Sequence, residues 1–348
     1  MIERELFGVT ADGMEVMLYR IHNSFGEFVE LLDYGAALHS AHVLGGSGSV
    51  EDVVLGARNA ADLTGFTLEG VTVGRCANRI ADARFVLEGK EYQLDVGRGG
   101  HCLHSGSGNY AFRHFEAAPC EAENKVAFSL HDSGEGGFGC AALARVSFSF
   151  DDSHRLSIEY EITPEGTTVL SPTNHAFFNL GCADARDHVL CVHAHEYAVK
   201  GEGGVPRGAV APVEGTPLDF HVPRTLRAAL EGAGDWFGQG RPEYDENLLL
   251  EGSGLREVAW LFAPPSGRGM RVYTDMPSLV LFTFAAPRPI HGKNGAVYTG
   301  FRSVCLETQF VTNAVNCPAF YAPVFHQGET LRSRTVYEFY TEEADQWK

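Results

Sequence analysis

Residues 145–161 read RVSFSFDDSHRLSIEYE, and this stretch indicates the fold of the chain. Apolar and polar residues alternate from Arg145 to Phe150 and again from Arg155 to Glu161, and Asp151-Asp152-Ser153 separates the two runs. Because successive side chains of a strand point to opposite faces, this alternation predicts two half-buried strands. A polar turn between two such runs is typical of antiparallel neighbours.

Similar runs recur along the chain, and each predicts a further strand. They cover residues 14–21, 28–32, 125–130, 189–192, 271–273 and 335–340. Glu88-Gly89 stands between two more runs, residues 84–87 and 90–94, which predicts a hairpin. Helical periodicity is confined to residues 57–66 and 225–230, too little for alternating strand–helix units. We therefore predict an all-β fold, a large antiparallel β-sandwich with a few short helices, formed by residues 1–348 as a single domain.

The composition of the chain restricts its possible binding partners and its cellular location. The chain is 44% hydrophobic and 21% charged, as globular proteins are, and its formal net charge of -18 repels nucleic acids and anionic membranes. The eight cysteines are scattered without a C-x-x-C pair, which indicates reduced thiols. The first residues lack the basic and apolar regions of a secretory signal, and no run approaches the ~18 apolar residues of a spanning helix. These features predict a soluble, cytoplasmic protein with no nucleic-acid or membrane partner.

Two patterns suggest cofactors but have simpler interpretations. Residues 134–139, GEGGFG, match the G-x-G-x-x-G fingerprint, yet the chain soon alternates like a strand where a dinucleotide site needs a helix. His188, His193 and His195 lack an acidic or cysteine ligand at a recognisable spacing, so we predict no metal there. The sequence also has no phosphate-binding P-loop, G-x-S-x-G or H-E-x-x-H motif.

Four segments taken together resemble the aldose 1-epimerase (galactose mutarotase) family in identity, order and spacing. They are GRCANRI at 74–80, LHSG at 103–106, TNHAFFNL at 173–180 and LETQ at 306–309. Supporting matches are VPRG at 205–208, GTPLDF at 215–220, YDEN at 244–247 and NAVN at 313–316. The resemblance covers roughly residues 10–340 and implies a β-supersandwich that binds a sugar in an open cleft.

Site residues are carried over by position from this resemblance. Glu307 matches the family's catalytic base and His175 its catalytic acid. Residues that match sugar-binding positions of the family are Arg79, His104, Asp245 and Asn78. Taken singly, each has an ordinary structural interpretation, such as an ion pair, a turn or a core histidine bonded to the backbone.

The chain departs from the family pattern at three places. Ser105 interrupts the family's L-H-G-G, and Asn109-Tyr110-Ala111 stands where the family has Gly-Phe-Asp. Val280 replaces a glutamine that often touches the sugar. Loss of that polar contact bears on which hexose is bound rather than on the chemistry.

Mutarotation requires a base at the anomeric hydroxyl and an acid at the ring oxygen. Together they open the ring to an aldehyde, which recloses as the other anomer. A carboxylate and an imidazolium on opposite sides of the reacting bond suffice, with no metal or other cofactor. We hypothesise that Glu307 is ionised and that His175 titrates near its ordinary pKa of ~6.5. The expected function is an isomerase that interconverts the α and β anomers of a free hexose such as glucose or galactose.

Three other functions remain open at this stage. An epimerase acting on a hexose phosphate would need extra cations near the sugar, for which Arg75, Arg113 and Arg288 are available. A non-catalytic carbohydrate-binding module would keep the cleft without turnover. A glycoside hydrolase would need a carboxylate pair, and Glu307 with Asp245 is the pair available. The preferred hexose is open, and the chain is compatible with a monomer or a homodimer.

Overall fold

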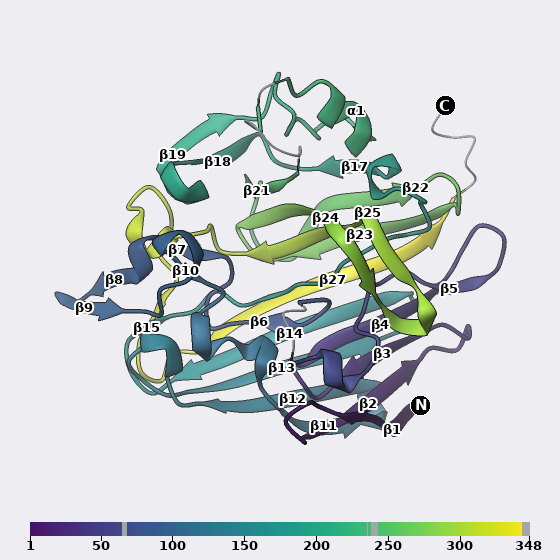
Figure 1. Cartoon of the computed structure of the whole chain (residues 1–348), viewed down its shortest axis with the longest axis horizontal. Coiled ribbons are helices and arrows are strands. Elements are labelled where there is room, and N and C mark those ends of the chain that lie inside the picture. The colour runs from purple at the N-terminus through teal and green to yellow at the C-terminus, as the bar shows by residue number, and fades with distance from the viewer. Residues whose placement is uncertain (65–67, 235, 238–242, 343–348) are drawn as a thin grey trace.

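The computed structural model describes residues 1–64, 68–234, 236–237 and 243–342, and antiparallel sheets dominate it (Figure 1). A nine-stranded sheet has the order β11-β12-β13-β14-β27-β23-β22-β17-β20. Its strands are β11 (Glu116–Cys120), β12 (Lys125–Asp132), β13 (Ala142–Phe150), β14 (Arg155–Pro164), β17 (Val189–Val192), β20 (Arg224–Thr225), β22 (Arg256–Ala263), β23 (Arg268–Thr274) and β27 (Leu331–Thr341).

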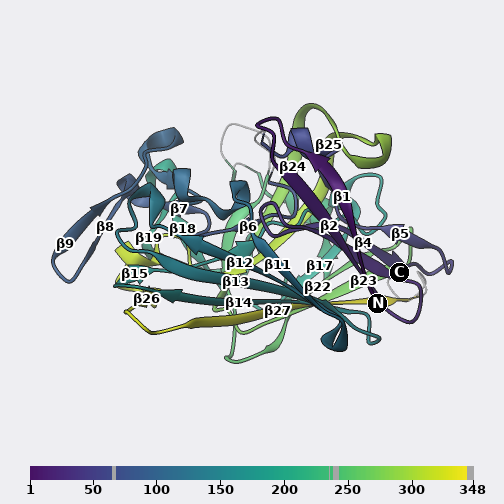
Figure 2. The ribbon, with the colours of Figure 1, turned by 90° about the horizontal axis from the view of Figure 1, so that it is seen from below.

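Two five-stranded sheets, β1-β2-β3-β4-β5 and β19-β18-β21-β24-β25, face the nine-stranded one (Figure 2). The first contains β1 (Ile2–Val9), β2 (Glu15–His22), β3 (Phe28–Leu32), β4 (Ala37–Leu44) and β5 (Val50–Asp52). The second contains β18 (Glu196–Lys200), β19 (Pro206–Pro212), β21 (Asp245–Leu249), β24 (Ser278–His291) and β25 (Val297–Gln309). Short pairs complete the strands: β6 (Thr72–Val73) with β16 (Thr173–Asn174), β7 (Arg79–Ile80) with β10 (Cys102–Leu103), β8 (Arg84–Leu87) with β9 (Lys90–Gln93), and β15 (Thr168–Val169) with β26 (Val324–Phe325).

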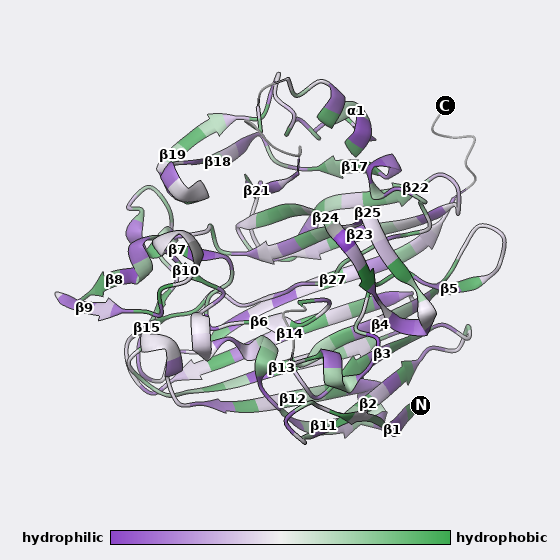
Figure 3. Cartoon of the chain, in the orientation of Figure 1, coloured by the Kyte–Doolittle hydropathy of each residue, from purple (hydrophilic) through white to green (hydrophobic). Residues whose placement is uncertain are grey.

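The alternating runs of the sequence form the centre of the nine-stranded sheet. Strands β13 and β14 pair with Val146 opposite Tyr160 and Phe148 opposite Ile158, and all four side chains are buried. The alternation of hydrophobic and hydrophilic residues along these strands is visible in Figure 3. On the other face Lys125 of β12 and Glu159 of β14 form an ion pair of 2.8 Å. One face therefore packs on the core and the other meets solvent, as antiparallel sheets allow.

The predicted all-β class and most of the predicted elements are confirmed. The hairpin at Glu88-Gly89 joins β8 to β9, and both turn residues have positive φ, as two-residue hairpin turns favour. The sequence GEGGFG forms a loop that leads into β13. The predicted helix at 225–230 is α1 (Leu226–Glu231), capped by the Thr225 side chain.

The helix predicted at 57–66 is wrong where it is described, because only a 3-10 turn at Ala60–Asp62 forms, and residues 65 and 66 lie outside the described residues. The other 3-10 turns are Ala81–Ala83, Arg98–Gly100, Gly106–Gly108, Tyr110–Phe112, Glu121–Glu123, Glu135–Gly137, Ala185–Asp187, Glu202–Gly204, Lys293–Gly295 and Ala314–Asn316. Within the described ranges, no helix has the length and apolar character needed to cross a bilayer.

Candidate active site

A pocket of about 260 Å³ opens beside β21, β24 and β25, and all six site residues predicted from the sequence line it. Its volume is near the lower end of the range for ligand pockets, roughly 300–1,000 Å³. The lining is Leu68, Glu69, Asn78, Arg79, Leu103, His104, His175, Phe177, Asp245, Phe282, Phe284, Ile290 and Glu307. These residues come from segments far apart in the chain, so the fold assembles the site.

Strand register places the two predicted acidic residues on one sheet face. On β25, Glu307 pairs with Val280 of β24, and the next pair on the same face is Cys305 with Phe282. Phe282 in turn pairs with Asp245 of β21. Because paired residues of antiparallel strands project to the same side, Glu307 and Asp245 both face the pocket.

Backbone pairing holds His175 against β25. Its N–H donates to the carbonyl of Val71 and its carbonyl accepts from Gly70, each at 2.9 Å. Three residues further on, Phe178 exchanges two backbone hydrogen bonds with Val304. The His175 ring stacks on Phe177 with centroids 4.8 Å apart, which restricts its rotation. The ring position is therefore set before any sugar arrives.

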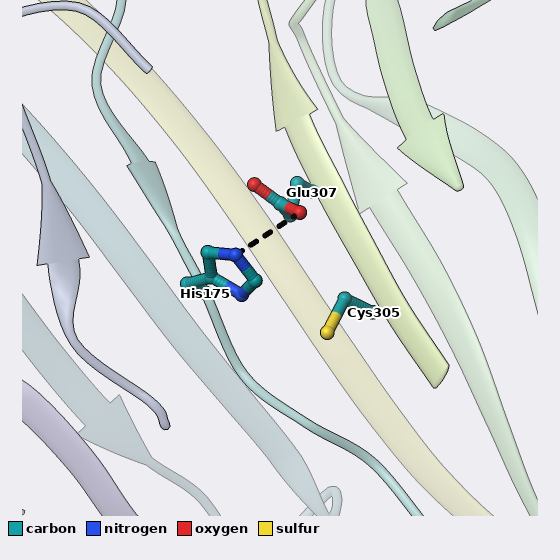
Figure 4. A group of neighbouring side chains, drawn as sticks. All are labelled: His175, Cys305 and Glu307. Atoms are coloured by element: carbon teal, nitrogen blue, oxygen red, sulfur yellow. Dashed lines mark ion pairs between the residues drawn. The ribbon is translucent and has the colours of Figure 1, made fainter. Parts of the chain in front are cut away.

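His175 and Glu307 point toward one another and form a buried pair (Figure 4). The His175 Nε2 atom lies 3.7 Å from Glu307 Oε1, and the side chains are 7% and 3% exposed. At this separation the two groups stand side by side. That arrangement suits a hemiacetal, whose hydroxyl oxygen and ring oxygen are bonded to the same carbon atom and can each meet one of two neighbouring groups.

Burial favours the neutral form of both groups. It raises the pKa of the Glu307 carboxyl well above its usual range, and the negative charge of Asp245 adds to the rise. Burial lowers the pKa of His175 to about 4. Both shifts run against the hypothesised ionised Glu307 and near-ordinary His175, because removal from water penalises each charge. The same shifts favour the state in which Glu307 holds the proton that the pair exchanges and His175 is neutral.

Asn78, Arg79 and Asp245 form a polar cluster at the pocket wall. Arg79 Nη1 donates to Asp245 Oδ2 at 2.9 Å and to Asn78 Oδ1 at 3.0 Å. The Asn78 side-chain amide donates to Asp245 Oδ1 at 3.3 Å. Burial opposes ionisation of Asp245, but Lys200 and Arg79 outweigh it and hold its pKa below the usual range. Asp245 is therefore a carboxylate that can accept hydrogen bonds from sugar hydroxyls.

His104 is held as a hydrogen-bond donor toward the pocket. Its Nδ1 accepts the backbone N–H of Asn78 at 3.1 Å, and burial lowers its pKa to about 3. A neutral imidazole whose Nδ1 accepts must carry its proton on Nε2. Ser105 steadies this loop in the left-handed region (φ +67°), and its hydroxyl bonds the N–H and carbonyl of Cys76 at 2.7 and 3.0 Å. This explains how serine replaces the family glycine.

Comparisons with known proteins show the family of this chain. A family model described as aldose 1-epimerase matches residues 17–338. The chain belongs to the aldose 1-epimerase family. It is 31% identical to an aldose 1-epimerase of Escherichia coli (strain K12), covering 95% of this chain and 97% of that protein. It is 33% identical to a galactose mutarotase of Rattus norvegicus, covering 89% of this chain and 90% of that protein.

Solved structures of the aldose 1-epimerase family share the fold. An aldose epimerase homologue from C. elegans superposes with a TM-score of 0.86 at 26% identity, covering 93% of this chain and 98% of the other. A galactose 1-epimerase from Lactobacillus acidophilus NCFM gives a TM-score of 0.84 at 21% identity, covering 99% of each, which supports the fold alone. The predicted supersandwich is thus confirmed.

Several pocket residues were not predicted from the sequence. Glu69 lines the pocket, burial raises its pKa, and its Oε2 has no hydrogen-bond partner among the described residues. It lies outside the segments in which the sequence resembles the aldose 1-epimerase family, so no signal singled it out. Phe282, Phe284 and Ile290 form an apolar wall. Val280, where the family often has glutamine, is fully buried beside Glu307 and supplies no polar group.

Residues considered for other functions lie elsewhere. His188 bonds the backbone of Ala185 and Leu180 through its two ring nitrogens, and His193 bonds that of Glu257 through Nδ1. Arg75 and Arg113 are ion-paired with Asp132 and Glu135, and Arg288 is exposed on β24. Of the described residues, Arg79 is the arginine that lines the pocket, and Asp245 neutralises it.

Proposed function

We propose that this chain is an aldose 1-epimerase in which Glu307 and His175 exchange protons with the hemiacetal of a free hexose. The chain's membership of the aldose 1-epimerase family supports the isomerase reaction. The observation that carries the residue assignment is the buried carboxyl–imidazole pair, 3.7 Å apart at the wall of a sugar-sized pocket. Asn78, Arg79, His104 and Asp245 supply polar contacts for the hydroxyls of the same sugar.

Glu307 and His175 together can supply and accept every proton that ring opening requires. Ring opening takes one proton from the anomeric hydroxyl and gives one to the ring oxygen, so the number of protons on the pair is unchanged. Before reaction, the mobile proton moves from Glu307 to His175 as the sugar hydroxyl donates to the carboxylate and the ring oxygen accepts from the imidazolium. Glu307 then takes the hydroxyl proton while His175 delivers its own. The roles reverse on reclosure, after the aldehyde has rotated.

Polarimetry of freshly dissolved α-glucose and α-galactose tests this function. The protein should speed equilibration of the anomers without any change of mass. Release of a second sugar from a disaccharide would favour a glycoside hydrolase. Binding without faster equilibration would favour a carbohydrate-binding module, and either result would overturn the proposal.

The pH profile of kcat/KM should differ from the profile of an enzyme whose catalytic histidine has an ordinary pKa. The active pair holds one mobile proton, so activity is lost in acid when His175 takes a second proton and in base when the pair loses its last one. Because burial lowers the pKa of His175 to about 4, the acid limb of kcat/KM should lie well below pH ~6.5, and because burial raises the pKa of Glu307, the basic limb should lie above the ordinary range of a glutamate. The measurement is polarimetry at each pH, corrected for the spontaneous rate. An acid limb near pH ~6.5 would contradict the proposed environment of His175.

Glu69→Gln should alter sugar preference more than chemistry. The unpartnered Oε2 of Glu69 lines the pocket and can accept a sugar hydroxyl. Glutamine replaces one acceptor oxygen with a donor, and leaving a buried hydroxyl donor unsatisfied costs about 1–3 kcal/mol, so kcat/KM for the preferred hexose should fall by roughly 10- to 100-fold, mainly through KM. A series of deoxyhexoses provides the control, because the sugar lacking the contacted hydroxyl should be insensitive to the substitution. An equal fall for every sugar would show that Glu69 does not select among them.

Further properties of the chain extend this proposal. We infer one domain, since a continuous apolar core draws residues from Tyr19 to Phe339. The scattered free cysteines and the composition favour a cytoplasmic location. We expect a monomer or a homodimer.

A further inference from the structure

Cys305 lies beside the buried pair and has no part in the proposed reaction. It is two residues before Glu307 on β25, on the same strand face, and its side chain is fully buried (Figure 4). A nitrogen of His175, the sulfur of Cys305 and a carboxylate oxygen of Glu307 all lie within 4.8 Å of one another. Glu307 Oε2 is buried and has no hydrogen-bond partner in the described part of the chain.

We propose that His175, Cys305 and Glu307 form an inhibitory site for a thiophilic divalent cation such as Zn²⁺. Imidazole nitrogen, thiolate and carboxylate are the ligand types that Zn²⁺ takes in proteins, at about 2.0–2.3 Å from the metal. Ligand atoms already this close need shifts of only roughly 1 Å to share one ion. The ion enters through the pocket, which His175 and Glu307 line, and Cys305 closes the site from behind.

Binding at this site blocks the reaction by removing both reacting groups. The Cys305 thiol and the Glu307 carboxyl each give up a proton to solvent as their bonds to zinc form, and no electrons are transferred. Glu307 and His175 are then occupied by the metal, so zinc and sugar exclude one another. Mg²⁺ and Ca²⁺, which prefer oxygen ligands, should not inhibit at the same concentration.

A second cluster provides an internal comparison. His195, His221 and Glu251 also bring their ligand atoms within 4.8 Å of one another, but all three are exposed. His195 Nε2 is 2.9 Å from Glu251 Oε1. This cluster contains no sulfur and does not touch the described pocket. Any cation bound there should leave turnover unchanged, and His195→Ala with His221→Ala removes it.

The test is zinc inhibition of anomer equilibration, followed by polarimetry with and without a chelator. Zn²⁺ should inhibit the wild type reversibly and in competition with the sugar. Cys305→Ala should keep metal-free turnover and raise the zinc concentration for half-inhibition by roughly tenfold or more, since even indirect partners of metal ligands contribute about 10–100-fold to affinity. The His195→Ala/His221→Ala variant should remain as sensitive as the wild type. Equal sensitivity of wild type and Cys305→Ala, or loss of inhibition in the surface variant, would overturn the proposal.

Cobalt binding supplies a readout that does not depend on activity. The inhibitory effect rests on the proposed function, but the binding itself does not. Co²⁺ added to the wild type should give a thiolate-to-cobalt absorption band that free galactose reduces and that Cys305→Ala and Cys305→Ser both lack. Absence of that band in the folded wild-type protein would refute the site, even if Glu307 and His175 prove to be catalytic.

Discussion

Glu307→Gln is expected to lower kcat by ~10²-fold or more while the protein stays folded, because glutamine keeps the shape of the side chain but cannot accept a proton. The carboxyl is 3% exposed, and its pKa is raised well above the usual range by burial. A neutral amide removes a buried ionisable group without leaving a buried charge unpaired, so the melting temperature should not fall by more than a few degrees.

The measurement is kcat of the Glu307→Gln variant, determined by polarimetry at saturating galactose and glucose, with thermal unfolding followed in parallel. Glu257→Gln on β22 is a suitable control, since this carboxylate belongs to the nine-stranded sheet and does not line the pocket. It should retain turnover within a few-fold of the wild type. If Glu307→Gln also keeps near-wild-type kcat, Glu307 is not the base.

His175→Asn should produce a loss of comparable size, ~10²-fold or more in kcat, because asparagine can donate a hydrogen bond but cannot deliver a proton at neutral pH. KM should change little, since the hydroxyl contacts proposed for Arg79, His104 and Asp245 remain. The variant should also lose the acid limb of the pH profile that His175 produces. Turnover within a few-fold of the wild type would remove His175 from the mechanism.

His188→Asn is the matched control for the loss of a buried imidazole. Burial lowers the pKa of His188 to about 4, as it does that of His175, but His188 bonds the backbone of Leu180 and Ala185 and lies outside the described pocket. Its replacement should lower the melting temperature and leave kcat per folded molecule nearly unchanged. The two variants thus separate a chemical role from a structural one.

The strands that could be predicted from the sequence are those with one solvent-exposed face. Residues 145–150 and 155–161 alternate because β13 and β14 bury one side and expose the other. The strands that carry the site gave no such signal. Residues 303–309 of β25 are buried on both faces, so polar and apolar residues do not alternate there. Glu307 was therefore identified by its family motif and not by a strand pattern.

The sequence predicted residues that form the site, but not how they are arranged or protonated. Motifs indicated Glu307 and His175, but their side-by-side placement depends on Phe178 pairing with Val304, a contact between segments far apart in the chain. Their protonation depends on burial, which single residue types do not reveal. Glu69 and Cys305 were missed for the same reason, because each becomes informative only through its neighbours in the folded protein.

A crystal structure of Glu307→Gln with bound galactose would show whether the hemiacetal meets the side chains at positions 307 and 175 together. We expect the anomeric oxygen to lie within about 2.6–3.2 Å of the side chain at position 307 and the ring oxygen to lie equally close to His175 Nε2. A sugar bound with its anomeric carbon turned away from both side chains, or seated outside this pocket, would contradict this expectation.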